Sequence, residues 1–200
     1  MCHGHAGTIV VSKVAGTDEI VGGYNPLVWD NSIEDVRMKT NDSFIFSLKN
    51  GNIQNSILSR VIDSRNALYY RNFNLQNFYG PWFGFSEFLM ESKVSDFTQD
   101  KLCQCFRYNS PEYDQCYEKP IRTTNEGFSI VDYEVFKIQC LYRSITYPCN
   151  ASAQRDMFLD WQYFLTRCKQ QMTVATNAKM YSDLHKGFPE LFHFEILTIE

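Results

Sequence analysis

The segment Glu19–Asp30, with the sequence EIVGGYNPLVWD, places two adjacent glycines inside an apolar run that otherwise has the character of a β-strand. Glycine weakens a strand, because it loses more conformational entropy on ordering than other residues and offers no side chain for packing. The pair Gly22 and Gly23 therefore indicates either that a bulky element crosses the strand closely or that the backbone bends there. The strand ends at Asn25 and Pro26, since proline donates no hydrogen bond to a ladder and restricts the residue before it.

The pattern of apolar residues predicts further strands around this one. Gly7–Val14 has a β-branched centre and is expected to form a hairpin with Glu19–Tyr24. In Ser43–Leu48, large apolar residues occupy alternate positions, so we expect one face of that strand to lie in the core. The remaining predicted elements are a short strand at 67–70, a turn at 79–85 that leads into a strand through Phe88–Met90, a polar loop at 91–127 and a long strand at Phe128–Ile138.

The chain of 200 residues is 16% aromatic, and aromatic and β-branched residues fit the pleated surface of a sheet. Many strands, few helices and antiparallel connections predict an α+β, mainly β fold with two sheet layers. After Ile138 the pattern changes, and apolar residues at helical spacing predict a helix over 152–172. We therefore expect residues 1–138 to form one domain, followed by a partly helical extension at 139–200 with an apolar, extended end at 191–199.

The charge and the cysteines exclude several classes of protein. The net charge is −4 and the sequence has no block of lysine or arginine, so the electrostatic footprint of a nucleic-acid-binding protein is missing. No apolar run approaches the ~18 residues that a membrane span needs, and the amino-terminal residues lack the pattern of a signal peptide. The 7 cysteines, without a secretory signal, predict reduced thiols in the cytoplasm.

Patterns for catalysis and metal binding are weak. Gly84–Phe88 begins like a nucleophile elbow but lacks its second glycine. Cys103 and Cys105 lack the two-residue gap that zinc knuckles favour, so reduced thiols are the preferred interpretation and redox sensing is the alternative. Asp132 and Glu134 share one strand face, which indicates a solvated face more than a general acid–base pair. We predict no catalytic residue, no metal ligand and no cofactor.

Four ordered motifs resemble the TLDc domain of eukaryotic oxidation-resistance proteins, over about Gly4 to Ile138. The resemblance implies a β-sandwich of two antiparallel sheets with a few flanking helices. The motifs are the hairpin with Gly22, Gly23 and Trp29, the strand SFIFSL with Phe44 and Phe46, the turn GPWFG with Gly80, Pro81, Phe83 and Gly84, and the closing strand that ends in EVF.

The resemblance also implies structural roles for these residues. An opposing element is expected to cross the sheet at Gly22 and Gly23, and Trp29 is expected to seal the edge of the sandwich after the turn. Side chains expected to face the inside of the sandwich are those of Phe44, Phe46 and Leu48, with Phe83, Phe85, Val135 and Ile138 as further core candidates.

Two glutamates remain as weak candidates for a functional role, beside the thiols of Cys103 and Cys105. Glu87 follows the GPWFG turn, where the family often has glycine and then histidine or aspartate. Glu134 lies within EVF and matches a recurrent glutamate of the family.

The function that the resemblance implies is a non-enzymatic, protein-binding role in resistance to oxidative stress. Subunits of the vacuolar-type proton pump are the candidate partner that it suggests. One alternative is a thiol-dependent, oxidant-responsive protein. The other is an inactive remnant: the family's usual first strand and helix are expected to be missing ahead of the first hairpin, which would make the chain an N-terminally truncated copy.

Overall fold

The computed structural model describes residues 3–49, 52–106, 115–140 and 192–196. The chain divides into two compact units, which are residues 1–137 with 197–200 and residues 138–196. The helix predicted over 152–172 lies outside the described residues. In the second unit, the strand β10 (Phe192–Ile196) falls within the segment that was predicted to be extended.

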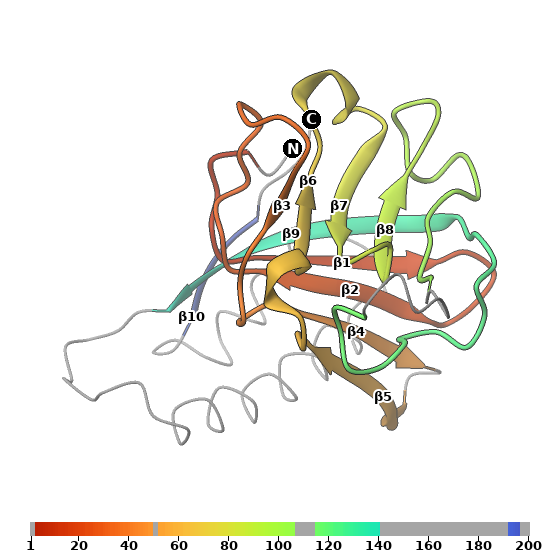
Figure 1. Cartoon of the computed structure of the whole chain (residues 1–200). Helices are drawn as coiled ribbons and strands as arrows, with labels where there is room; N and C mark the ends of the chain where they lie inside the picture. The colour runs from red at the N-terminus through yellow and green to blue at the C-terminus, as the bar shows by residue number, and fades with distance from the viewer. Residues whose placement is uncertain (1–2, 50–51, 107–114, 141–191, 197–200) are drawn as a thin grey trace, which may run out of the picture. The chain divides into compact units, whose positions relative to one another are not determined.

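The larger sheet of the first unit contains the predicted amino-terminal hairpin at its centre. Its strands follow the order β9-β1-β2-β4-β5, and each neighbouring pair is antiparallel (Figure 1). Strand β5 was not predicted, because its residues do not alternate between apolar and polar; it forms by pairing along β4. The bounds are β1 (Thr8–Val14), β2 (Ile20–Asn25), β4 (Phe44–Lys49), β5 (Asn52–Arg60) and β9 (Ile130–Cys140).

The second sheet has four strands in the order β3-β6-β7-β8, and two short 3-10 helices flank β6. It packs against the first sheet, so the predicted mainly β, two-layer sandwich is confirmed (Figure 1). The bounds are β3 (Val36–Met38), η1 (Ser64–Asn66), β6 (Leu68–Tyr70), η2 (Phe73–Leu75), β7 (Tyr79–Phe83) and β8 (Phe88–Glu91).

The segment from Tyr79 to Met90 differs from its prediction as a turn followed by one strand. The residues predicted as a turn form β7, and a tight turn then leads into β8, so the segment is a hairpin. Two residues of that turn have positive φ angles, Gly84 at +61° and Ser86 at +80°. The sequence misled because proline is unusual inside a strand, and here Pro81 lies at an irregularity in the register of β7 against β8.

The core lies between the two sheets and consists of fully buried apolar side chains. The rings of Phe83 and Phe88 stack at 5.7 Å between centroids, and the hydroxyl of Tyr117 donates to the carbonyl of Ala67 at 2.7 Å. The predicted core residues Phe83 and Val135 are confirmed, and Phe85 packs half-buried against the core. The side chain of Ile138 lies outside the described ones. Other members of the core are Val10, Val14, Val21, Ile45, Leu68, Met90 and Ile130.

The glycine pair of β2 marks close approaches on both faces of the strand. A Cβ atom on Gly23 would lie 2.6 Å from Cζ of Phe83, which comes from the opposing sheet. A Cβ atom on Gly22 would overlap the carbonyl oxygen of Val10 and would lie 2.5 Å from Cζ of Phe46, so its close neighbours on the other face come from the adjacent strands β1 and β4 of the same sheet. The register of β2 runs without a shift against both neighbouring strands. Close approach is therefore the correct alternative, and a backbone bend is not.

The orientation of β4 is the reverse of the one expected. Ile45 pairs with Gly23 and packs in the core between the sheets, so Phe44, Phe46 and Leu48 point to the opposite face, although they too are buried. The alternation was correctly recognised, but burial on both faces removes the contrast that would tell which face is internal. On the face of this segment that points between the sheets, small polar residues accompany Ile45. The hydroxyl of Ser43, for example, lies 2.9 Å from that of Tyr117.

We expect Gly23→Ala to lower the free energy of unfolding by about 1–3 kcal/mol, because the added methyl group overpacks the contact with the Phe83 ring. Thermal or denaturant unfolding of the full chain measures this loss. The double variant Gly23→Ala with Phe83→Leu gives the control, since the smaller side chain relieves the clash. The stability lost in the double variant should then be less than the sum of the losses in the two single variants. An unchanged stability of Gly23→Ala would contradict the close approach.

Candidate functional site

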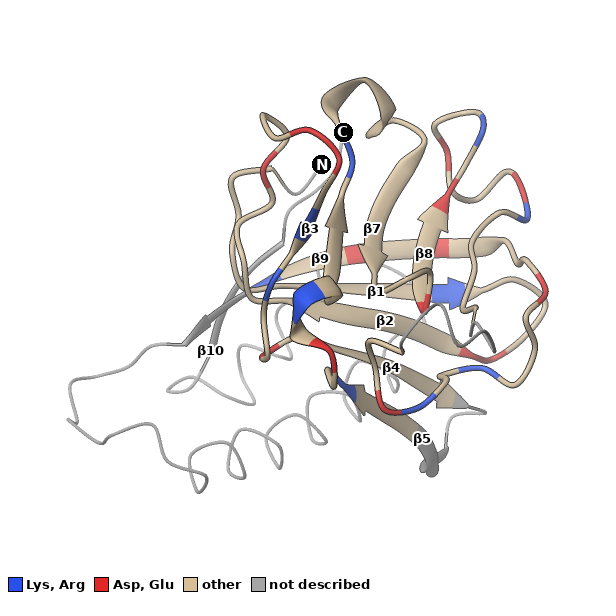
Figure 2. Ribbon diagram, viewed as in Figure 1, with Lys and Arg blue, Asp and Glu red and all other residues tan. Residues whose placement is uncertain are grey.

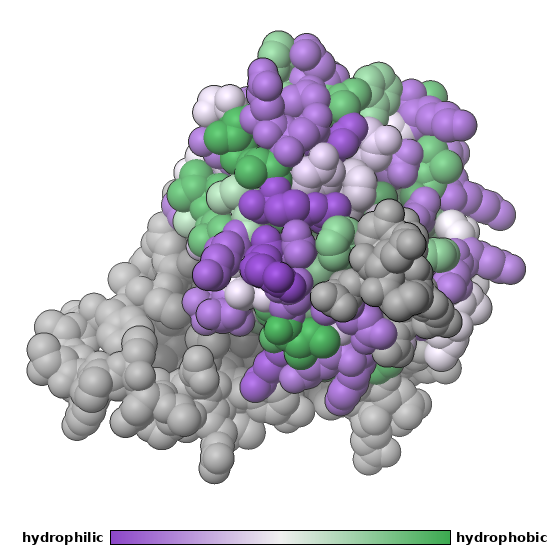
Figure 3. All heavy atoms as spheres, in the orientation of Figure 1, coloured by the Kyte–Doolittle hydropathy of each residue, from purple (hydrophilic) through white to green (hydrophobic). Residues whose placement is uncertain are grey.

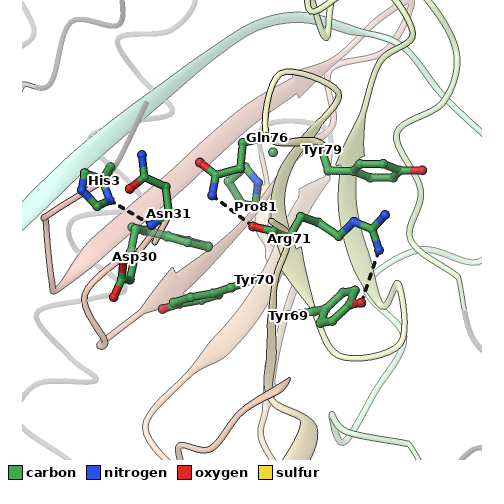
Figure 4. Close-up of a pocket in the computed structure, with 11 residues that line it drawn as sticks. His3, Asp30, Asn31, Tyr69, Tyr70, Arg71, Gln76, Tyr79 and Pro81 are labelled. Atoms are coloured by element: carbon green, nitrogen blue, oxygen red, sulfur yellow. Dashed lines mark hydrogen bonds between the residues drawn. The ribbon is translucent and has the colours of Figure 1, made fainter. Parts of the chain in front are cut away.

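A pocket of about 50 Å³ lies beside the end of β6 and the start of β7 (Figure 4). Three segments far apart in the sequence meet there: the amino-terminal residues, the connection from β2 to β3, and the connection from β6 to β7. The residues that line it are His3, Trp29, Asp30, Asn31, Tyr69, Tyr70, Arg71, Gln76, Tyr79, Gly80 and Pro81.

Trp29 forms a wall of this pocket and joins it to the core. Its ring stacks on that of Tyr70 with 4.9 Å between centroids and 27° between planes. The indole Nε1 donates to Oγ1 of Thr8 at 2.7 Å, and the Tyr70 hydroxyl accepts a bond from the side-chain amide of Asn25 at 2.8 Å. Trp29 packs half-buried against the core, at the edge of the sandwich where it was expected.

The charged groups of the pocket are partly paired, although the Nε atom of Arg71 is buried without a hydrogen-bond partner among the described residues. The Arg71 guanidinium lies 3.3 Å from a carboxylate oxygen of Asp35, with its Cζ 4.7 Å from the centre of the Tyr79 ring. Asp30 accepts bonds from the backbone nitrogen and the hydroxyl of Ser32 at 2.8 and 2.6 Å, and these bonds lower the pKa of the Asp30 carboxyl.

Next to the pocket, the outer face of the second sheet carries arginines stacked on aromatic rings. Cζ of Arg37 lies 4.2 Å from the centre of the Tyr69 ring and 4.5 Å from that of Phe85. Tyr69 meets Trp82 edge-on at 4.8 Å. Arginine over an aromatic face is stabilised by the ring quadrupole, so these cations are held in place. Figure 2 shows such cations interspersed with acidic residues, with no block of one sign on the face that it presents.

Glu87 acts as a clamp in the turn between β7 and β8. Its carboxylate accepts backbone N–H bonds from Tyr117 at 2.9 Å, from Cys116 at 3.0 Å and from Phe85 at 3.3 Å. Burial raises the pKa of Glu87, while these bonds act in the opposite direction. Gly84 has a φ of +61°, which favours glycine, and a Cβ atom there would also overlap the same carboxylate. The geometry assigns Glu87 to holding the loop at 116–117 against the second sheet.

Glu134 lies on β9 opposite Val11, with its side chain half-buried. Its Oε2 atom is buried and accepts no hydrogen bond from the described residues. Burial raises the pKa of Glu134, and the nearby carboxylate of Asp132 adds to the rise. Glu134 does not line the pocket.

The cysteine thiols singled out by the sequence are buried, with Cys103 fully enclosed and Cys105 4% exposed. Burial raises the pKa of Cys103 to about 11 and that of Cys105 well above its ordinary value. Cys116 is buried as well, and its pKa rises to about 12 for the same main reason. Since the thiolate is the reactive form, these environments oppose redox chemistry at neutral pH.

The sequence motifs of the resemblance supply scaffold and only part of the pocket. Gly80, Pro81 and Trp29 line it, whereas Glu87, Cys103 and Cys105 do not. Sequence reasoning missed Asn31, Arg71 and Gln76, because they lie in connections that carry no recognisable pattern. The Trp29 motif and the GPWFG turn were the signals that pointed to this end of the molecule.

The model of the TLDc domain matches residues 1–139. The match covers more than half of the chain, and the chain belongs to the TLDc family, which is associated with oxidation resistance. No curated protein and no solved structure matched the chain. Among the described residues, no helix is both long enough and apolar enough to span a membrane.

We expect Glu134→Gln to stabilise the protein increasingly as the pH rises. The raised pKa means that the folded state binds the proton more tightly than the unfolded state, so wild-type stability falls as the pH rises from the ordinary carboxyl value through the raised one. The neutral amide removes this dependence. Urea unfolding of both proteins between pH 4 and 8 measures the difference in stability, and a difference that stays constant across that range would contradict the assignment.

Proposed function

We propose that the protein is a non-enzymatic, protein-binding module of the TLDc type that acts in oxidation resistance in the cytoplasm. Membership of the family supports the class, since TLDc domains are protein-interaction modules in general. The single observation that carries the proposal for this chain is the concentration of exposed apolar residues beside the pocket, on the segments 27–31 and 71–80. These segments, with the pocket between them, are called the loop end below.

The loop end exposes large apolar side chains that the fold does not need. Phe73 is 67% exposed, Val28 49% and Phe78 38%. Val28 and Phe78 adjoin pocket residues in the sequence, and Phe73 lies two residues after Arg71. Aromatic residues and arginine are enriched at protein interfaces and supply most hot spots of binding. Figure 3 shows apolar residues in small separate patches among polar ones, which suits a limited contact with a partner better than a large permanent interface.

We further propose subunits of the vacuolar-type proton pump as the partner. Support for this partner comes from the resemblance of the motifs to oxidation-resistance proteins. The loop end is the surface through which the contact is expected, because it is the part of the described chain where a pocket and exposed aromatic side chains occur together.

The thiol-dependent alternative receives no support from the environment of its cysteines. A sensor or peroxidatic cysteine has a lowered pKa and is accessible. Cys103, Cys105 and Cys116 have the opposite properties, since all are buried and their pKa values are raised.

Affinity capture of pump subunits by the purified full chain tests the proposed function. We expect Phe73→Ser combined with Phe78→Ser to weaken capture by at least about tenfold, as is typical when aromatic anchors are lost. The matched control is Val94→Ser with Val131→Ser, which removes two apolar side chains exposed elsewhere and should leave capture unchanged. If the folded protein captures no pump subunit, the proposed partner is wrong. If capture is equally strong without the two phenylalanines, the loop end is not the contact surface.

Labelling with iodoacetamide, mapped by peptide mass spectrometry, tests the alternative. At pH 7.5 we expect Cys103 to react roughly 100-fold more slowly than in the urea-unfolded chain, because its pKa of about 11 leaves very little thiolate. The unfolded chain serves as the reference for each cysteine. Fast labelling of native Cys103 or Cys105, together with peroxide consumption that is lost in Cys103→Ser, would favour the thiol-dependent function.

A further inference from the structure

No further inference is drawn: the strongest candidate, the face of the larger sheet that points away from the second sheet and carries Val11, Phe46 and Phe136, is apolar and buried, but nothing among the described residues shows what covers it.

Discussion

The contact between Gly23 and the ring of Phe83 fixes how closely the two sheets approach, and the rest of the described structure follows from it. Because Gly23 has no side chain, the ring from β7 lies directly on the backbone of β2. On the other face, the ring of Phe46, which is paired with Gly22 on the neighbouring strand β4 of the same sheet, lies against Gly22. Strand β2 is thus a layer of backbone between two aromatic rings, which explains why glycine is used twice where entropy disfavours it.

This arrangement also positions the pocket. With β7 held over β2, the connection that leaves β2 and the connection that enters β7 emerge side by side, and Trp29 stacks on Tyr70 between them. Asn25, at the end of β2, donates to Tyr70 and joins the same edge. The carboxylate of Glu87 accepts backbone hydrogen bonds that hold a loop in place. The raised pKa of a buried thiol such as Cys103 leaves little reactive thiolate at neutral pH. Glu87 and the buried thiols therefore serve the structure, whereas the loop end presents aromatic side chains to a partner.

The sequence predicted most of the strands but few residues of the candidate site. Alternation and the glycine pair predicted the central hairpin and β4, because half-buried strands have a period of two. The facing of β4 was wrong, since Phe46 and Ile45 are both buried and the pattern alone does not rank them. Pro81 concealed the hairpin of β7 and β8, and β5 has little apolar alternation. Asn31 and Gln76 line the same pocket only through the fold, so no local pattern in the sequence marks them.

Native-state hydrogen exchange of the full chain tests most directly whether the Gly23–Phe83 contact holds the sandwich together. If it does, the amides of β2 and β7 that are bonded within the sheets exchange only through global unfolding, with the same free energy as measured by denaturant. Amides of the loop end should exchange through much smaller local openings in the same experiment. Exchange of β2 or β7 at a free energy well below that of global unfolding would show that the two sheets separate independently and would contradict the account.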